Sequence, residues 1–145
     1  MKNLDKTNPL EKISQSLKNT SQMAKNFSSL LKLNDVVTLY GPLGSGKTFF
    51  VKAIAKSFGA KNVSSPSFVI LNEYKTKIPI YHFDFYRLKN EEEIANIGFC
   101  DFLNQRGIFF IEWPEMSEKM LPKNHYKIFF EILNENSRKI TIKHN

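Results

Sequence analysis

The segment from Gly41 to Thr48 constrains the fold of this chain more than any other stretch. It reads GPLGSGKT and satisfies the pattern G-x-x-x-x-G-K-[ST] of a phosphate-binding loop. Residues 36–40 before it, VVTLY, are apolar and β-branched and predict a strand, and residues 49–58 after it, FFVKAIAKSF, predict a helix. A strand, a glycine-rich loop and a helix in this order are the context that the motif requires. The segment therefore predicts an α/β fold with a site for a nucleoside triphosphate.

The residues of this loop suggest how the phosphates would be held. Backbone N–H groups of the glycine-rich turn would converge on phosphate oxygens, and the helix N-terminus would add its partial positive charge. The Lys47 ammonium would reach the β- and γ-phosphates, and the Thr48 hydroxyl would bind Mg²⁺. A simple turn before a helix is the alternative, but every fixed position of the motif is present. We expect the nucleotide to bind at Gly41, Gly44, Ser45, Gly46, Lys47, Thr48 and Phe49.

The rest of the chain predicts one domain around a mostly parallel sheet. Its 145 residues suit a single core, and no Pro/Gly/Ser linker divides them. Residues 1–9 look like a loose tail, and the apolar spacing of residues 10–33 predicts two helices or one broken helix, with Asn19–Ser21 as the break and N-cap. Further elements are expected as antiparallel strands at 68–74 and 78–86, a helix capped by Asn90, a buried strand at 107–113 and a hairpin at 126–133 and 138–143. We expect a P-loop NTPase-like three-layer α/β sandwich, its central sheet mostly parallel with antiparallel additions, in one domain over residues 1–145.

Two carboxylates are candidates to complete the site. Glu112 follows four apolar residues at the end of a predicted strand, where ligands collect in such sheets and where a buried carboxylate suggests a cation beside it. Asp84 lies in the sequence HFDFYR, and strand alternation places it on one face with His82 and Tyr86. Asp84 could position water, act as a general base or hold Mg²⁺ through its water shell, and His82 could orient it. A solvent-facing Glu112 and a structural His82 remain the alternatives.

One more segment is a candidate for sensing the nucleotide. Ser65-Pro66-Ser67 follows the loop by one helix, so its hydroxyls could meet the γ-phosphate or Mg²⁺ and reorder on hydrolysis. A simple Ser-Pro turn is equally consistent with the position. The helix start near Asn19-Thr20 and the tail around Arg138 could enclose adenine, which the spacing does not itself establish, and we include Ser67 and Arg138 among the nucleotide-binding residues.

Composition limits the other possibilities. Lys and Arg total 21 against 14 Asp and Glu, a balance of +7 that suits phosphate-rich partners, but the lysines are scattered rather than clustered. The one cysteine, Cys100, excludes an internal disulfide and is expected in the core. No signal peptide or membrane-spanning run is visible in the sequence. We expect a cytoplasmic protein that does not associate with a membrane.

Four motifs in order resemble one family, TsaE (also called YjeE). They are Gly41–Thr48, then Ser65–Phe68 (SPSF), then His82–Arg87 (HFDFYR) and Ile111–Glu115 (IEWPE). The resemblance extends from about residue 20 to Glu115, and the C-terminal hairpin matches in general character. Pro42 departs from the family's usual acidic residue, and Ser67 replaces its usual Thr. The resemblance implies a small bacterial ATPase required for making N6-threonylcarbamoyladenosine in tRNA.

The resemblance also implies individual roles. Thr48 and Glu112 would bind Mg²⁺, Asp84 would be needed for hydrolysis of ATP, and Trp113 would contact the nucleotide site or a partner. The implied partners are TsaD, the threonylcarbamoyl-transferring subunit, and its paralogue TsaB, and tRNA would be met indirectly through their complex. Hydrolysis would reset that complex between turnovers and would be slow in its absence.

Three alternative functions share the phosphate-binding loop. A small kinase would need an arginine-rich lid, whereas Arg87, Arg106 and Arg138 are far apart in the sequence, and a GTPase would need an N-K-x-D motif that does not occur. An ATP-gated binding module, in which hydrolysis is incidental, is not separable from a catalyst by sequence.

Overall fold

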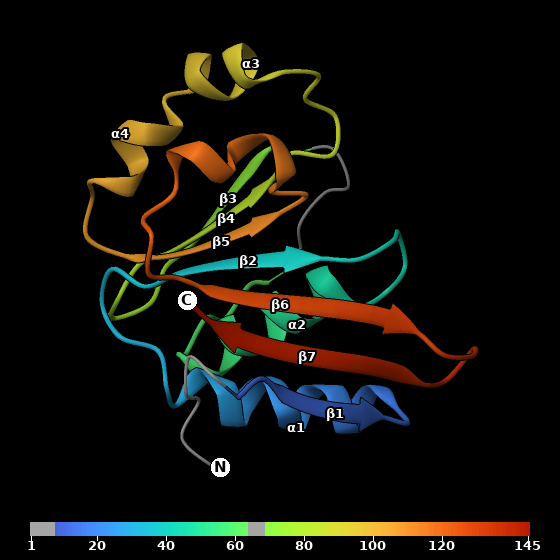
Figure 1. Cartoon of the computed structure of the whole chain (residues 1–145). Helices are drawn as coiled ribbons and strands as arrows, with labels where there is room; N and C mark the ends of the chain where they lie inside the picture. Colours follow the sequence, from blue (N-terminus) through green and yellow to red (C-terminus); the bar gives the residue numbers. More distant parts are fainter. Residues whose placement is uncertain (1–7, 64–68) are drawn as a thin grey trace.

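The computed structural model describes residues 8–63 and 69–145, which form a seven-stranded sheet in the order β1-β7-β6-β2-β5-β4-β3 (Figure 1). The central strands β6, β2, β5 and β4 are parallel, and the antiparallel pairs are β7 with β6, β1 with β7, and β3 with β4. This confirms the predicted α/β class, the mostly parallel centre and the antiparallel additions. The strands are β1 (Leu10–Ser14), β2 (Val36–Tyr40), β3 (Leu71–Tyr74), β4 (Ile80–Asp84), β5 (Ile108–Glu112), β6 (Tyr126–Ile132) and β7 (Arg138–His144).

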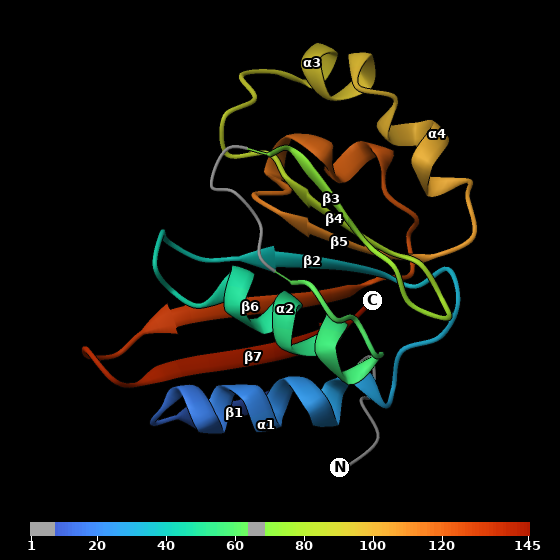
Figure 2. The ribbon, with the colours of Figure 1, turned by 180° about the vertical axis from the view of Figure 1, so that it is seen from behind.

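Helices cover both faces of the sheet, which gives the three layers (Figures 1 and 2). The helices on one face are α1 (Leu17–Ser28) and α2 (Lys47–Ser57), and those on the other are α3 (Glu91–Asn96), α4 (Phe99–Leu103) and the 3₁₀ helix η1 (Glu115–Met120). Strand β5 contributes side chains to the two hydrophobic cores, one on each face of the sheet. Its Phe110 packs with α1 and α2, while Phe109 and Ile111 pack with the opposite layer. Successive side chains of a strand point to opposite faces, so this uninterrupted apolar run suits a strand buried on both sides.

The parallel register brings the polar ends of the central strands to one edge. Strands β2 and β5 pair in parallel, as do β4 and β5, and Asp84 at the end of β4 lies opposite Glu112 at the end of β5. The chain leaves β2 at the same edge and enters the glycine-rich loop before α2. Carboxyl ends of parallel strands are where ligands collect in open α/β sheets, as predicted for Glu112.

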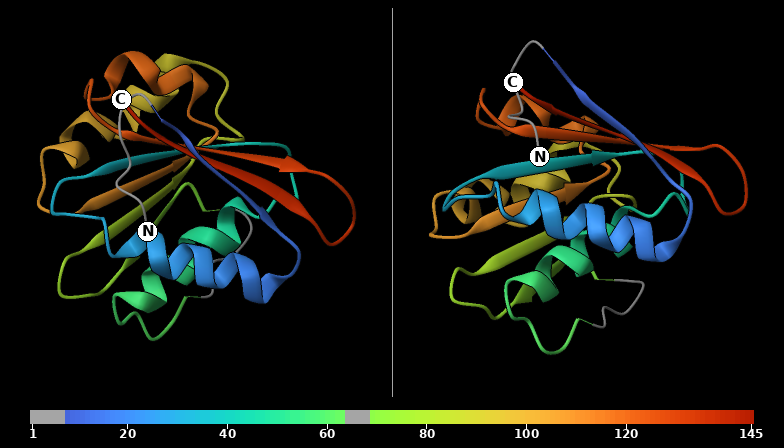
Figure 3. Two further views of the ribbon diagram at one scale, coloured as in Figure 1. Left: turned by 60° about the horizontal axis from the view of Figure 1, so that its bottom comes forward. Right: turned by 90° about the horizontal axis from the view of Figure 1, so that it is seen from below.

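The N-terminal region differs from the prediction. Residues 10–14, expected to be helical, form the edge strand β1, which pairs with β7 from Leu10↔Ile142 to Ser14↔Arg138 (Figure 3). The helix begins later, with Ser16 rather than Asn19–Ser21 as its N-cap, and α1 then continues without a break. The exposed side chain of Ile13 shows why the apolar spacing misled: that residue belongs to an edge strand and not to a buried helix face. Of the predicted tail, residues 1–7 lie outside the described residues.

Two further expectations can be compared with the structure. Asn90 does cap α3, since its side chain accepts the N–H of Glu93. Cys100, expected in the core, is exposed on α4, so that expectation was wrong. Within residues 8–63 and 69–145, no helix is long and apolar enough to cross a bilayer.

Candidate functional site

The backbone of the phosphate-binding loop adopts conformations that explain its glycines. Gly41, Gly44 and Gly46 have φ values of 148°, 76° and 103°, a range that L side chains rarely adopt. A Cβ on Gly41 would also lie 2.7 Å from the carbonyl oxygen of Phe130 and 2.9 Å from Ser45 Oγ. The loop therefore needs glycine at its first position for space as well as for backbone angle.

Lys47 folds back over this loop instead of extending into solvent. It is 4% exposed, and its Nζ donates to the carbonyl oxygens of Gly41 and of Pro42, the latter at 3.1 Å. The same Nζ lies 4.2 Å from the centre of the Trp113 ring, within the range of a cation–π contact. Burial lowers the pKa of Lys47, and the negative charges of Glu112 and Asp84 oppose that shift. The ammonium is thus held at the loop by oxygens that a phosphate group could replace.

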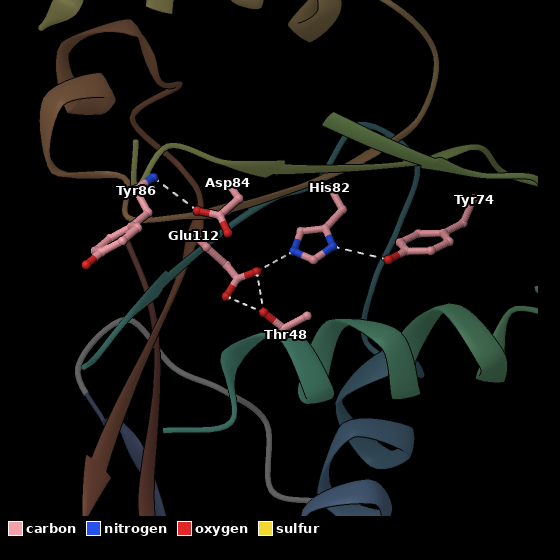
Figure 4. Close-up of polar contacts among 6 residues, drawn as sticks. All are labelled: Thr48, Tyr74, His82, Asp84, Tyr86 and Glu112. Atoms are coloured by element: carbon pink, nitrogen blue, oxygen red, sulfur yellow. Dashed lines mark hydrogen bonds and ion pairs between the residues drawn. The ribbon is translucent and has the colours of Figure 1, made fainter. Parts of the chain in front are cut away.

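Thr48 and Glu112 meet at the start of α2 (Figure 4). Thr48 Oγ1 donates to Glu112 and lies 2.9 Å from both Oε1 and Oε2 of that carboxylate. Glu112 is only 3% exposed, so the sequence alternative of a solvent-facing glutamate does not hold. A hydroxyl and a carboxylate side by side supply the oxygen ligands that Mg²⁺ prefers.

His82 binds Glu112 and not Asp84, in contrast to the orientation considered from sequence. Its Nε2 lies 2.6 Å from Glu112 Oε2, and its Nδ1 lies 3.3 Å from the hydroxyl of Tyr74. His82 is itself buried, on the face of β4 that α2 covers. Strand alternation correctly placed His82 and Asp84 on one face, but the partner of the histidine depends on how β4 and β5 pair.

Asp84 occupies a different environment from Glu112. Its Oδ1 accepts the backbone N–H of Tyr86 at 3.0 Å, and its side chain is half-buried. Burial raises the pKa of Asp84, and the nearby Glu112 charge adds to the shift, while the Tyr86 N–H and His82 oppose it. A carboxylate with a raised pKa at the rim of a cavity is suited to accept a proton from water.

Trp113 has a backbone conformation that no sequence pattern indicated. Its φ is 55°, in the left-handed region that bulky residues seldom adopt. The turn places the indole between the Lys47 ammonium and the Tyr86 ring, whose centre lies 4.9 Å from that of Trp113. Backbone strain of this kind is common at functional sites, where surrounding contacts maintain it.

A cavity of about 330 Å³ brings these groups together. Asp84, Glu112 and Trp113 line it with the loop, and so do two exposed residues that sequence reasoning missed, Leu17 and Leu43. The sequence did not indicate a role for Leu17 at the site, because its spacing matched that of the other apolar residues of the first predicted helix. Of the predicted nucleotide-binding residues, those that line the cavity are Gly44, Ser45, Gly46, Lys47, Thr48 and Phe49.

The other predicted nucleotide-binding residues lie in different places. Arg138 reaches the loop from β7, since its Nη2 donates to the Gly44 carbonyl at 3.3 Å and its Nη1 binds carbonyls of the turn at 134–137, including Asn134 at 2.8 Å. Ser67, with the rest of its motif, falls outside the described residues. Gly41 is part of the loop backbone and accepts from Lys47.

The donor set fits a magnesium-bound nucleotide. No cluster of three or more His, Cys, Asp or Glu residues able to hold a metal occurs among residues 8–63 and 69–145. A cation at this site would therefore take Thr48 and Glu112 from the protein, and its remaining ligands from phosphates and water. This division is usual for Mg²⁺, which keeps several waters and few protein ligands at phosphate sites.

Comparisons with known proteins agree with these features. The family described as "Threonylcarbamoyl adenosine biosynthesis protein TsaE" matches residues 14–140. The tRNA threonylcarbamoyladenosine biosynthesis protein TsaE of Rickettsia prowazekii is 43% identical over 130 residues, which is 88% of this chain and 90% of that protein. The protein of the same name from Bacillus subtilis is 36% identical and covers 84% of this chain and 77% of its own length.

A solved structure also resembles the fold. The crystal structure of YdiB from Bacillus subtilis superposes with a TM-score of 0.74 at 29% sequence identity, covering 93% of this chain and 84% of YdiB. The family match spans most of the described sheet, from the end of β1 to the middle of β7, and includes every motif of the site. The chain belongs to the TsaE family of tRNA threonylcarbamoyladenosine biosynthesis proteins.

Proposed function

We propose that this chain binds ATP with Mg²⁺ in the cavity beside the phosphate-binding loop and hydrolyses it. One observation carries the proposal: the Lys47 ammonium and the Thr48–Glu112 pair line a single cavity at the start of α2. The Glu112 carboxylate and the Thr48 hydroxyl place oxygen ligands of the kind that Mg²⁺ prefers side by side at a phosphate-binding loop, which favours a metal site there.

Each residue has a distinct task in this proposal. Lys47 would exchange its contacts with the Gly41 and Pro42 carbonyls for contacts with phosphate oxygens, and the backbone amides of residues 44–48 would hold the remaining oxygens. Thr48 and Glu112 would hold Mg²⁺, which neutralises charge on the phosphates when bound. Asp84 would orient or deprotonate the attacking water, either directly or from the water shell of the metal.

The family membership supports a place for this activity in the cell. Its relatives are named for tRNA threonylcarbamoyladenosine biosynthesis. We therefore propose that hydrolysis resets a TsaB–TsaD complex between turnovers in the cytoplasm, and that tRNA is reached through that complex. The exposed Leu17 and Leu43 at the cavity mouth offer apolar surface beside the nucleotide.

The test is Mg²⁺-dependent ATP hydrolysis by the purified protein, with and without the matching TsaB–TsaD pair. Slow turnover that the pair strongly stimulates, and that Lys47→Ala abolishes, is the expected result. Turnover that appears only with a small acceptor, with phosphate transferred to it, would instead identify a kinase.

The variant Asp84→Ala distinguishes an ATP-gated binding module from an ATPase that acts by hydrolysis. If hydrolysis resets the complex, this variant should bind ATP and the pair but fail to support repeated rounds of tRNA modification. Full support of modification by a variant without hydrolysis would show that binding of the nucleotide is sufficient.

A further inference from the structure

A continuous chain of hydrogen bonds runs from the edge of the sheet to the phosphate-binding helix. It links the Tyr74 hydroxyl on β3 to His82 Nδ1 on β4 at 3.3 Å, and His82 Nε2 to Glu112 Oε2 on β5 at 2.6 Å. Glu112 in turn accepts from Thr48 on α2 at 2.9 Å (Figure 4). Four elements separated in sequence thus contribute to the placement of one carboxylate.

The direction of donation at Glu112 follows from its charge. An ionised Glu112 can only accept, so the hydrogen of the short contact lies on His82 Nε2. The other ring nitrogen, Nδ1, lies within hydrogen-bond distance of the Tyr74 hydroxyl. Tyr74 thereby helps to hold the ring in the orientation that presents Nε2 to the carboxylate.

The strand register explains why Glu112 needs such a partner. Asp84 lies directly opposite Glu112 across the β4–β5 pair, and adjacent like charges repel. His82 lies two residues before Asp84 on β4, so its hydrogen bond directs the Glu112 side chain back along the strand pair. The histidine binds Oε2, while Thr48 Oγ1 lies 2.9 Å from both carboxylate oxygens, so the carboxylate is held with its oxygens toward Thr48, where the two proposed magnesium ligands meet.

We propose that His82 is a positioning residue for Glu112 and that Tyr74 fixes the ring of His82 for this purpose. The inference rests on the proposed Mg²⁺-dependent reaction and assigns to it two residues that are not part of the described cavity lining. Partners that orient metal ligands in this way commonly change metal affinity or activity by about 10–100-fold when removed.

Three substitutions test the chain. Tyr74→Phe removes one hydroxyl and keeps the ring that stacks near His82. His82→Asn ends too short to reach Glu112, whereas His82→Gln carries an amide N–H to about the position of Nε2 and should restore the contact. The control is Tyr81→Phe, which removes the hydroxyl that donates to Gln105 from the neighbouring residue of β4, on the opposite face of the sheet.

Two readouts separate positioning from general stability. The first is the Mg²⁺ concentration that gives half-maximal ATP hydrolysis, with KM and kcat measured separately. The second does not depend on turnover: ADP binding with and without Mg²⁺, followed by the fluorescence of Trp113, the single tryptophan of the chain and part of the cavity wall. Thermal melts check that every variant is folded.

We expect His82→Asn to raise the half-saturating Mg²⁺ concentration by about 10-fold or more and Tyr74→Phe by about 3-fold, with ADP binding in EDTA unchanged. His82→Gln should recover most of the loss, and Tyr81→Phe should match the parent. Variants that melt lower but keep the parent's Mg²⁺ requirement would overturn the positioning assignment and leave the proposed function standing. A parent with neither ATP hydrolysis nor Mg²⁺-dependent ADP binding would overturn both.

Discussion

Alanine substitutions at Gly41, Gly44 and Gly59 distinguish two reasons for glycine in the phosphate-binding loop, which are its backbone angle and the close contacts of its Cα. Gly44 and Gly59 have φ values of 76° and 98°, and a Cβ at either would meet nothing within 4 Å. Alanine at either position should lower the free energy of unfolding by about 1–2 kcal/mol, because an L residue is strained in the left-handed region. Alanine also lowers the conformational entropy of the unfolded chain, which reduces the net loss to about 1 kcal/mol. Gly59 follows α2 on its far side from the loop and serves as the matched control.

Gly41→Ala should cost more, because two penalties add. Its φ of 148° also disfavours an L side chain, at about 1–3 kcal/mol, and a Cβ 2.7 Å from the backbone oxygen of Phe130 forces the loop or β6 to move, at about 1–3 kcal/mol more. The sum is about 4 kcal/mol. At about 3–4 °C per kcal/mol for a chain of this size, the melting temperature should fall by about 12–16 °C, against about 3–4 °C for Gly44→Ala and Gly59→Ala.

The assay is thermal unfolding followed by circular dichroism, with ADP binding measured on the same samples. Gly44→Ala and Gly59→Ala should melt together, but only Gly44→Ala should weaken ADP binding, because Gly44 lines the cavity. If Gly41→Ala melted within 2–3 °C of Gly44→Ala (about 1 kcal/mol), the approach to Phe130 would not be what requires glycine there. Equal loss of ADP affinity in Gly44→Ala and Gly59→Ala would refute the assignment of the loop.

The remaining predictions concern single side chains. Lys47→Ala should weaken ATP binding by about 10-fold or more in equilibrium titrations, because a charged contact to phosphate is worth about 1.5–3 kcal/mol; unchanged affinity would place the phosphates elsewhere. Glu112→Ala should lower Mg²⁺-dependent turnover by about 100-fold and leave ADP binding in EDTA near the parent value, which a parallel loss of both would contradict. His125 lies buried with its Nδ1 donating to the Pro122 carbonyl at 2.7 Å, and burial lowers its pKa below the ordinary 6.5. As the pH falls through 6.5, the unfolded chain therefore binds a proton at His125 before the folded protein does, and the folded protein loses stability. His125→Asn removes this titration and can keep the hydrogen bond to Pro122. The melting temperature of this variant should fall less than that of the parent between about pH 7.5 and about pH 5.5.

Local constraints are the part of this molecule that sequence predicted well. The loop conformation depends on three glycines within six residues, Gly41, Gly44 and Gly46, and the capping of α3 depends on Asn90 and the backbone three residues later. The antiparallel β3–β4 pair followed from the short turn between the two strands. In each of these cases the deciding residues lie close together in the chain, so no knowledge of distant pairing is required.

Distant pairing explains what the sequence could not predict. Residues 10–14 have apolar spacing compatible with a helix or a strand, and only the edge of β7 decides between them. Arg138 was expected to bind the nucleotide, and its contact with the Gly44 carbonyl at 3.3 Å depends on the position of β7 beside the loop. The contacts of the Trp113 indole, which its left-handed backbone places near Lys47 and Tyr86, likewise join residues distant in the chain.

The sequence left open which of the two carboxylates would bind metal and which would act on water, and the pairing of β4 with β5 gives them different surroundings. Asp84 and Glu112 stand opposite each other on parallel strands, but among the described residues Glu112 receives donors from His82 and Thr48, whereas Asp84 accepts the backbone N–H of Tyr86. Burial raises the pKa of Asp84, and the Glu112 charge adds to the rise. A carboxylate surrounded by donors is suited to remain a ligand, while one whose proton affinity is raised is suited to accept a proton. The environments therefore favour Glu112 as the metal ligand and Asp84 as the group that acts on water, and Asp84→Asn should lower kcat while leaving the half-saturating Mg²⁺ concentration near that of the parent. A rise in that concentration equal to the rise in Glu112→Ala would instead place Asp84 in the metal site.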